Sequence, residues 1–556
     1  MSEGGVIPAP QTFNHLRNSR KTVEKRGRGA GITVPSRRLH TPNAVPLSRN
    51  RSTGAQTRTH QRTCRRRIQL LRCTRSTAVL TQHRIHRIQP YSLNSLTTPP
   101  SAPNAVPIER IEPLMPDTPM SINAINYGAD PTGAKDSTAA IQRAVDDVAA
   151  RGGGSVELPR GIYRVSYPFI DIKHRVEIFG YGSSTVVIAH SDRAIPATAN
   201  GHTEYTGVFH VGSYTTPVYG NYNANKPMRM GVRNLHIRTN AANTPINSYP
   251  LDAHTAPLNN VAGVIFHTHL TGDQLNEPDI VPVIAGVEVW DTAIGVAVLG
   301  LDDQGMKIDD VTIRRTLNQG LLLGKPAGHP RRPNEGQNSG AADNKLRGVD
   351  VAEANLSGGS YAGIEVYAAQ AKFENCSSNS NHRTSNKYAL YEPATRHAGA
   401  GWIVQGERNM FIGCTARSNA GHGWIVEWAH NIFIGCEAEG SSWAGTVSGA
   451  ARADEAANWY ISRNARGTRM VAPVSYNPPE KPASLYGFYI ENKIYDLRIT
   501  EGTAKDDRIG DGNMLGRRVY VTGAIGANVV IEVEELRHST SPAGQLTKEA
   551  YNVMRG

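Results

Sequence analysis

Carboxylate and imidazole side chains recur within a repeated segment of this 556-residue chain, at positions where they could carry out acid–base chemistry. The candidates for catalysis within the repeats are Glu407, His422 and Glu427. Hydrolysis of a glycosidic bond requires one carboxylic acid that protonates the leaving oxygen and a second carboxylate that acts as base or nucleophile. The imidazole of His422 could exchange a proton near neutral pH, although its setting, Gly421-His422-Gly423, also suits a tight turn.

The segment 382–397 supplies a second set of reactive groups. It lengthens the interval between the first two repeat copies to 38 residues, whereas the next interval is 22 residues. Arg383 and Lys387 are candidate catalytic residues, because removal of the proton beside a uronate carboxyl requires a base and a cation that neutralises the carboxylate. Arg396 and His397 are candidate substrate-binding residues. A long loop on a rigid repeat often carries binding residues, and a solvated loop without a role is the alternative.

Alignment of the repeat copies on their leading glycines places further candidate binding residues in one column, Tyr367, Gln405 and Glu427. Because side chains alternate along a strand, this column should point away from the core that contains Val366, Val404 and Val426. We expect the outer surface of the repeats to form a groove for an extended chain of sugars. Trp428 and Trp443 could stack on sugar rings there.

The repeat predicts the architecture that positions these residues. Each copy has a Phe ten residues, and a Cys thirteen residues, after its leading Gly, namely Phe373 and Cys376, Phe411 and Cys414, and Phe433 and Cys436. Short apolar runs that end at Gly or Asn indicate strands and turns, and a fixed period of about 22 residues is typical of a solenoid. We predict an all-β solenoid with coils roughly 4.8 Å apart. Equivalent Phe and Cys side chains, and Trp402 and Trp424, should stack in its core.

The five cysteines do not follow a metal-binding pattern. Cys64 and Cys73 lie near the N-terminus and the other three occupy one slot of the repeat, whereas zinc sites need close pairs such as C-x₂-C. We expect buried, reduced thiols and no cofactor. A calcium ion held by clustered carboxylates is the alternative, and the acidic residues that could hold it are Asp291, Asp302, Asp303, Asp309 and Asp310.

The net charge of +12 is concentrated at the N-terminus. Residues 1–108 contain 19 Lys or Arg against Glu3 and Glu24, which leaves 41 basic and 46 acidic residues for the remainder. Residues 1–118 should form a disordered basic tail, and we favour an extension without function, with translation starting at Met115 or Met120. Nucleic-acid binding through phosphates fits less well because aromatics are scarce, and an organellar presequence is a further alternative.

The chain changes character at Ser121, where we expect the fold to begin. A helix over residues 136–150, capped by Asp136 or Ser137, should cover the open end of the solenoid. Its apolar face consists of Ile141, Ala144, Val145 and Val148. We assign residues 119–540 to the β-helix domain and 541–556 to a C-terminal tail. No segment has the length of a membrane span, and no secretory signal is recognised.

The start of this domain resembles the N-terminal signature of the pectate-lyase-like superfamily, in its rhamnogalacturonase/epimerase-type branch. The residues that carry the resemblance are Asn126-Tyr-Gly-Ala-Asp130, Asp136-Ser-Thr-Ala-Ala-Ile141-Gln, Gly152-Gly-Gly-Ser-Val-Glu-Leu-Pro159, Gly161-Ile-Tyr-Arg-Val165 and Ile178-Phe-Gly-Tyr-Gly182. The match is close over about 60 residues. It implies a single-stranded right-handed parallel β-helix.

The resemblance also implies a carbohydrate-active protein, although a fold does not determine a function. The sequence lacks the Asn-Thr-Asp motif of polygalacturonase-type hydrolases, and its folded part lacks the Asp-Pro-His motif of mannuronan epimerases. We expect a polysaccharide lyase or glycoside hydrolase that acts on an acidic polysaccharide. The alternative is a tailspike-like glycan-binding protein, which would be a homotrimer at a virion surface or another extracellular location.

Overall fold

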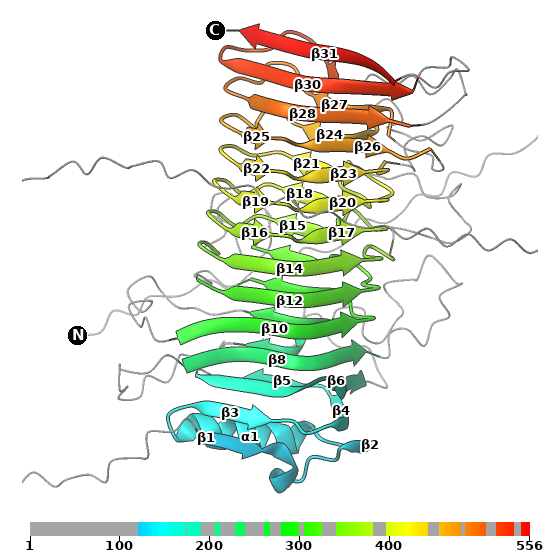
Figure 1. Cartoon of the computed structure of the whole chain (residues 1–556). Helices are drawn as coiled ribbons and strands as arrows, with labels where there is room; N and C mark the ends of the chain where they lie inside the picture. The colour runs from blue at the N-terminus through cyan, green and yellow to red at the C-terminus, as the bar shows by residue number, and fades with distance from the viewer. Residues whose placement is uncertain are drawn as a thin grey trace, which may run out of the picture. The chain divides into compact units, whose positions relative to one another are not determined.

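The computed structural model describes residues 120–173, 175–190, 206–211, 228–239, 261–266, 280–299, 305–324, 341–357, 359–381, 396–442, 455–479, 484–507, 519–538 and 546–555. The basic tail expected at residues 1–118 lies outside this part of the chain. The described residues form a right-handed parallel β-helix, as the repeat and the resemblance predicted (Figure 1). None of the helices in the described ranges has the length and apolar character needed to cross a membrane.

Two long sheets run along the solenoid. The first, called sheet 1, has 20 strands: β1 (Met120–Asn123), β2 (Thr132–Asp136), β3 (Gly154–Glu157), β4 (Gly161–Ser166), β6 (Val176–His190), β8 (Met228–Thr239), β10 (Ile280–Trp290), β12 (Lys307–Arg314), β14 (Lys345–Ala352), β16 (Lys372–Glu374), β17 (Ser377–Asn379), β19 (Met410–Ile412), β20 (Thr415–Arg417), β22 (Ile432–Ile434), β23 (Glu437–Glu439), β25 (Arg469–Val471), β26 (Val474–Asn477), β28 (Arg498–Asp506), β30 (Val529–His538) and β31 (Leu546–Arg555).

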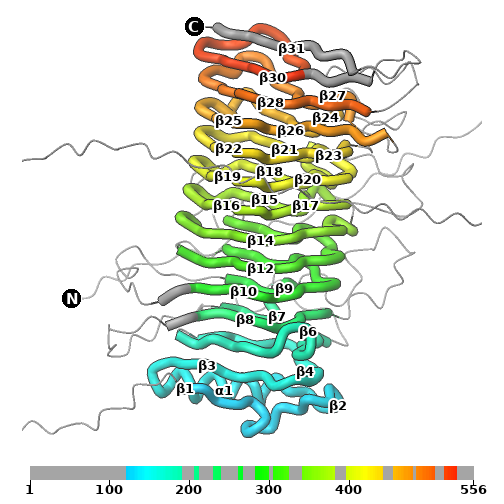
Figure 2. The backbone as a smooth tube through the Cα atoms, in the orientation of Figure 1, coloured from blue at the N-terminus to red at the C-terminus, as the bar shows by residue number. Residues whose placement is uncertain are grey.

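The second sheet, called sheet 2, has 11 parallel strands: β5 (Ile170–Ile172), β7 (Thr206–Val211), β9 (Val261–Phe266), β11 (Ile294–Val298), β13 (Leu321–Leu323), β15 (Ile364–Val366), β18 (Trp402–Val404), β21 (Trp424–Val426), β24 (Ala457–Ile461), β27 (Tyr486–Ile490) and β29 (Val519–Val521). Each coil contributes one strand to this sheet, and the coils stack one upon another (Figure 2).

In the repeats, each coil adds two short strands to sheet 1, separated by a sharp corner. The corner residues Asn375, Gly413, Gly435 and Ala472 all have positive φ angles, between 48° and 60°. Glycine adopts this conformation without the steric cost that a Cβ atom brings. The corner therefore explains the Gly of the Phe-Ile-Gly-Cys sequence, which turns the chain between β19 and β20 and between β22 and β23.

The core contains the expected ladders of like side chains. The ring centroid of Phe411 lies 4.8 Å from that of Phe373 and 4.7 Å from that of Phe433, with nearly parallel planes. Trp402 and Trp424 stack at 4.5 Å and pack edge-on against the Phe ladder. Each indole also donates a hydrogen bond to a backbone carbonyl inside the coil. The predicted stacking is thus confirmed.

The repeat cysteines form a third ladder. Cys376, Cys414 and Cys436 are free thiols with at most 1% exposure, as predicted. Burial raises the pKa of the central Cys414 thiol, which disfavours the reactive thiolate. Because all three side chains are buried, they pack as small apolar side chains of the core.

Both ends of the solenoid differ from its middle. Helix α1 (Thr138–Ala150), preceded by the 3₁₀ helix η1 (Ala124–Tyr127), packs its predicted apolar face into the core. The Asp136 carboxylate accepts a hydrogen bond from the Thr138 backbone amide at 2.8 Å. At the other end, β31 pairs antiparallel with β30, so the segment 541–556, which we expected to be a tail, contains a strand.

Candidate functional site

The outer face of sheet 2 carries the predicted column of polar residues. Val366, Val404 and Val426 face the main core, and the residue after each of them points to the opposite side of the sheet. Gln405 and Glu427 remain partly exposed there. Tyr367 is buried instead, and packs in a separate apolar cluster on this outer side.

Glu427 and His397 form a close pair on this face. Glu427 Oε2 lies 3.0 Å from His397 Nε2, and the Gln405 amide donates to the same oxygen. Burial opposes charge on both side chains, but their mutual hydrogen bond and attraction outweigh it, so the pKa of His397 is raised and the pKa of Glu427 is lowered. The environment of the pair therefore favours a protonated imidazole beside an ionised carboxylate.

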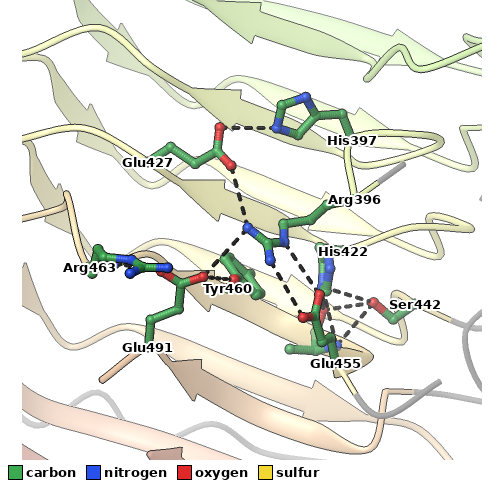
Figure 3. A network of polar contacts seen from close by, with 10 residues as sticks. Arg396, His397, His422, Glu427, Ser442, Glu455, Tyr460, Arg463 and Glu491 are labelled. Atoms are coloured by element: carbon green, nitrogen blue, oxygen red, sulfur yellow. Dashed lines mark hydrogen bonds and ion pairs between the residues drawn. The ribbon is translucent and has the colours of Figure 1, made fainter. Parts of the chain in front are cut away.

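Arg396 lies at the centre of a larger group of charges (Figure 3). Its guanidinium makes two hydrogen bonds to Glu455, at 3.3 and 3.4 Å. It also stacks over the ring of Tyr460, with 4.1 Å between Arg396 Cζ and the ring centroid. Its remaining nitrogen, Nη1, lies 3.9 Å from Glu427 Oε1 and 3.5 Å from Glu491 Oε1. One guanidinium thus bridges three carboxylates.

The Glu491 carboxylate accepts hydrogen bonds from several groups. The Tyr460 hydroxyl donates to it, as do the backbone amide of Arg463 at 3.0 Å and the Arg463 side chain at 3.3 Å. Burial opposes its ionisation, but these donors and Arg396 lower the pKa of Glu491. Because Glu427 and Glu491 both contact one Arg396 nitrogen, their nearest oxygens are closer together than the roughly 9.5 Å that carboxyl pairs of glycosidases reach.

Glu365 is a further carboxyl group on this face, with opposite electrostatics. Its side chain is 2% exposed and accepts hydrogen bonds from the Ala362 amide, the Gln319 amide and the Tyr367 hydroxyl, at 3.0 to 3.1 Å. Burial outweighs these donors and raises the pKa of Glu365. Carboxyl groups whose pKa values are shifted in opposite directions are typical of acid–base sites.

His422 lies at the edge of the same network, buried beside Tyr460. Its Nδ1 atom is 3.2 Å from the Ala457 carbonyl oxygen and 3.4 Å from the Ser442 hydroxyl. Burial lowers the pKa of His422 to about 4. The imidazole is therefore neutral at physiological pH, and its nitrogen is engaged with the backbone.

We expect acid to destabilise the protein through His422. Because the pKa is about 4 when folded and about 6.5 when unfolded, the unfolded chain binds more protons between these values, and the free energy of unfolding falls as the pH drops through this range. Urea midpoints measured between about pH 4 and 7 should show this slope. His422→Gln should reduce it, whereas replacing the exposed His430 should not. Equal slopes for both variants would exclude His422 as the source.

The other predicted site residues lie apart from this network or outside the described residues. Among the described residues, Glu407 makes no side-chain hydrogen bond or ion pair with the cluster, and its backbone carbonyl accepts from Gln370. Trp428 is half-buried, and its carbonyl oxygen accepts from Asn431. Arg383, Lys387 and Trp443 lie outside the described residues.

The acidic residues considered for calcium binding lie only partly within the described ranges. Asp291 is buried and pairs with Arg238 and Arg315, while Asp309 pairs with Arg347. Asp302 and Asp303 lie outside the described residues. Within the described ranges, no group of three or more His, Cys, Asp or Glu side chains could hold a metal ion.

Sequence reasoning missed Glu491, Glu455 and Tyr460. A signal for Glu491 was present, because Gly-Phe-Tyr-Ile-Glu491 repeats the pattern of Gly-Trp-Ile-Val-Glu427. Strand pairing places Ile490 two rungs above Val426, so both glutamates belong to one column. Long segments between these coils make the 22-residue period hard to recognise in the sequence. Glu455 lies in one of these segments.

Comparison with known proteins identifies the start of the fold. Residues 121–295 match the family model for rhamnogalacturonase A/epimerase, pectate lyase-like. The chain is 44% identical over 79 residues to mannuronan C5-epimerase AlgE3 of Azotobacter vinelandii, which covers 13% of this chain and 4% of that protein. A match to AlgE2 of the same organism, 44% identical over 75 residues, covers 12% and 8%. The chain thus spans less than a tenth of these relatives.

Alignments with solved structures cover more of the chain. The A-module of mannuronan C-5 epimerase AlgE4 from Azotobacter vinelandii covers 73% of this chain and 99% of its own length, with 14% identity and a TM-score of 0.43. The gp42 tailspike of an Acinetobacter phage covers 77% of this chain and 64% of its own length, with 11% identity and a TM-score of 0.44.

Proposed function

The chain belongs to the pectate-lyase-like superfamily, and on that premise we propose that it cleaves a polysaccharide held along the outer face of sheet 2. The observation that carries this proposal is the His397–Glu427 pair, whose surroundings favour a protonated imidazole and which lies across Arg396 from a second carboxylate, Glu491. A proton donor and a carboxylate that flank one point are the parts that glycosidic cleavage needs. Similarity to polysaccharide-modifying epimerases supports the same class of substrate.

Hydrolysis fits the described residues better than β-elimination. Elimination requires a cation that is available to neutralise a uronate carboxylate. Within the described part of the cluster, Arg396 and Arg463 already pair with glutamates. We assign the proton donor to the His397–Glu427 pair and the activation of water to Glu491, with Tyr460 and Arg463 positioning Glu491. The buried residues Glu365, Tyr367 and His422 stabilise this outer face of sheet 2.

The reaction can be identified by incubating the full chain with a panel of acidic and neutral polysaccharides. Reducing ends and absorbance near 235 nm, which reports an unsaturated uronate formed by proton abstraction, are followed together. We expect reducing ends without absorbance. Reducing ends accompanied by absorbance would contradict hydrolysis and indicate a lyase.

A glycan-binding spike without catalysis is the second candidate. It is favoured by the mutual pairing of charges around Arg396, which would equally suit a rigid binding surface. Such a protein would be a homotrimer at a virion surface or another extracellular location. Glycan binding without any product across the panel would select this candidate and reject the enzyme.

A further inference from the structure

Sheet 1 carries an aliphatic surface that is unrelated to the polar site on sheet 2. Five side chains on β19, β22 and β25 point away from the core and occupy two adjoining columns. They are called the aliphatic patch and consist of Met410, Ile412, Ile432, Ile434 and Val471. The alternate residues of these strands, Phe411, Phe433 and Met470, face inward. The patch therefore lies on the solvent side of the sheet.

The patch is contiguous and accessible. Ile434 and Val471 are each 39% exposed, and strand pairing places them on neighbouring rungs. Beside them the corner residues Gly413 and Gly435 have no side chain that could cover the surface. Contiguous exposed apolar surfaces are often interaction sites. Its aliphatic side chains offer no hydrogen bonds, which argues against a sugar as the bound molecule.

Charged residues at the border of the aliphatic patch indicate which partner could bind it. The rung below the patch carries Lys372 and Glu374, one in each column, and they pair with each other within β16. Suppose that a second copy is related by a two-fold axis parallel to the solenoid. Each rung then faces the same rung of the second copy, and each of the two columns faces the other column of that copy. Lys372 therefore lies opposite Glu374 of the second copy, and the aliphatic side chains of the two copies face each other.

We propose that this face binds the same face of a second copy of the chain, with the two solenoids side by side and parallel. An antiparallel pair would instead place Lys372 opposite Arg469 of the other copy, because these residues border the patch at its two ends in one column. Arg469 is already paired with Asp496 at 2.8 Å, but the antiparallel pair lacks the attraction between Lys372 and Glu374 that the parallel pair provides. In the parallel pair the next rung brings Lys345 opposite Arg347, whose charge is already paired with Asp309.

Sedimentation velocity of the full chain over a range of concentrations tests this pairing. We expect a monomer–dimer equilibrium that Ile434→Lys weakens by about tenfold or more, because it places a charge in the apolar contact. Ala139→Lys, on the exposed side of helix α1 and outside sheet 1, is the matched control and should leave the equilibrium unchanged. Circular dichroism verifies that both variants are folded.

A charge exchange provides an independent test. Lys372→Glu should weaken the dimer by placing two acidic residues opposite each other, and the double variant with Glu374→Lys should restore it. A monomer at every concentration, a dimer that Ile434→Lys leaves intact, or a trimer would overturn the proposal. Glycan cleavage is measured separately on sheet 2, so failure of this proposal is distinguishable from failure of the proposed function.

Discussion

Replacing Glu427 by Gln is expected to lower the rate of glycan cleavage by about 10²–10⁴-fold. The amide retains the shape of the side chain but removes the charge that raises the pKa of His397. The imidazole of His397 then loses its proton at a lower pH, and less of the protein carries the proton donor. Initial rates of reducing-end formation measure this effect. The alkaline limb of activity should also move toward lower pH, because the imidazolium proton of His397 is held less tightly.

Glu437→Gln is the matched control for this experiment. Glu437 is a partly exposed carboxylate on β23 of sheet 1, paired with Arg417 at 3.3 Å, so it resembles Glu427 in chemistry but lies on the other sheet. Its replacement should leave the rate unchanged. Full activity of the Glu427 variant in a folded protein would remove the His397–Glu427 pair from the mechanism.

Replacing Phe411 by Ala is expected to lower the free energy of unfolding by about 3–5 kcal/mol. The ring is fully buried between Phe373 and Phe433 and contacts two indoles edge-on. Neighbouring coils restrict the movement that could close the cavity. The loss of packing therefore adds to the lost transfer of the ring from water.

Denaturant unfolding measures this cost, with Thr415→Ala as the reference variant. Thr415 lies on the outer side of the same coil, partly exposed, and its truncation should change stability by no more than about 0.5 kcal/mol. If both variants unfold at the same denaturant concentration, the aromatic ladder does not stabilise this part of the solenoid.

The fold could be predicted because the core residues recur in the sequence with the period of the coils. Phe and Cys recur at identical offsets from a Gly, and stacking at one rung per coil requires such recurrence. One feature carried no comparable signal. The pairing of β31 with β30 involves a strand outside the repeat, and its direction is antiparallel.

The candidate site was only partly predictable. Alternation along a strand predicts which side of the sheet a side chain points to, but not whether other parts of the chain bury it there. The column with Glu427 does lie on the outer face, yet Tyr367 in the same column is buried. Burial there depends on which segments cross the face, and a repeat pattern contains no information about them. Likewise Arg396 and His397 were singled out as part of a polar insertion, but the repeat pattern contains no information about their contacts with Glu427, Glu455 and Glu491.

The matched register of the repeat coils limits how this molecule can change in size. β18 and β21 pair without any shift, as do β19 and β22, and in a solenoid each coil contacts chiefly the coils on either side. Loss or duplication of one complete unit therefore preserves all remaining stacks, whereas an insertion of a few residues within a strand shifts its register. The solenoid can thus lengthen or shorten along its axis only in whole turns, while a segment inserted between strands, such as 382–397, leaves the pairing of β15 with β18 in register.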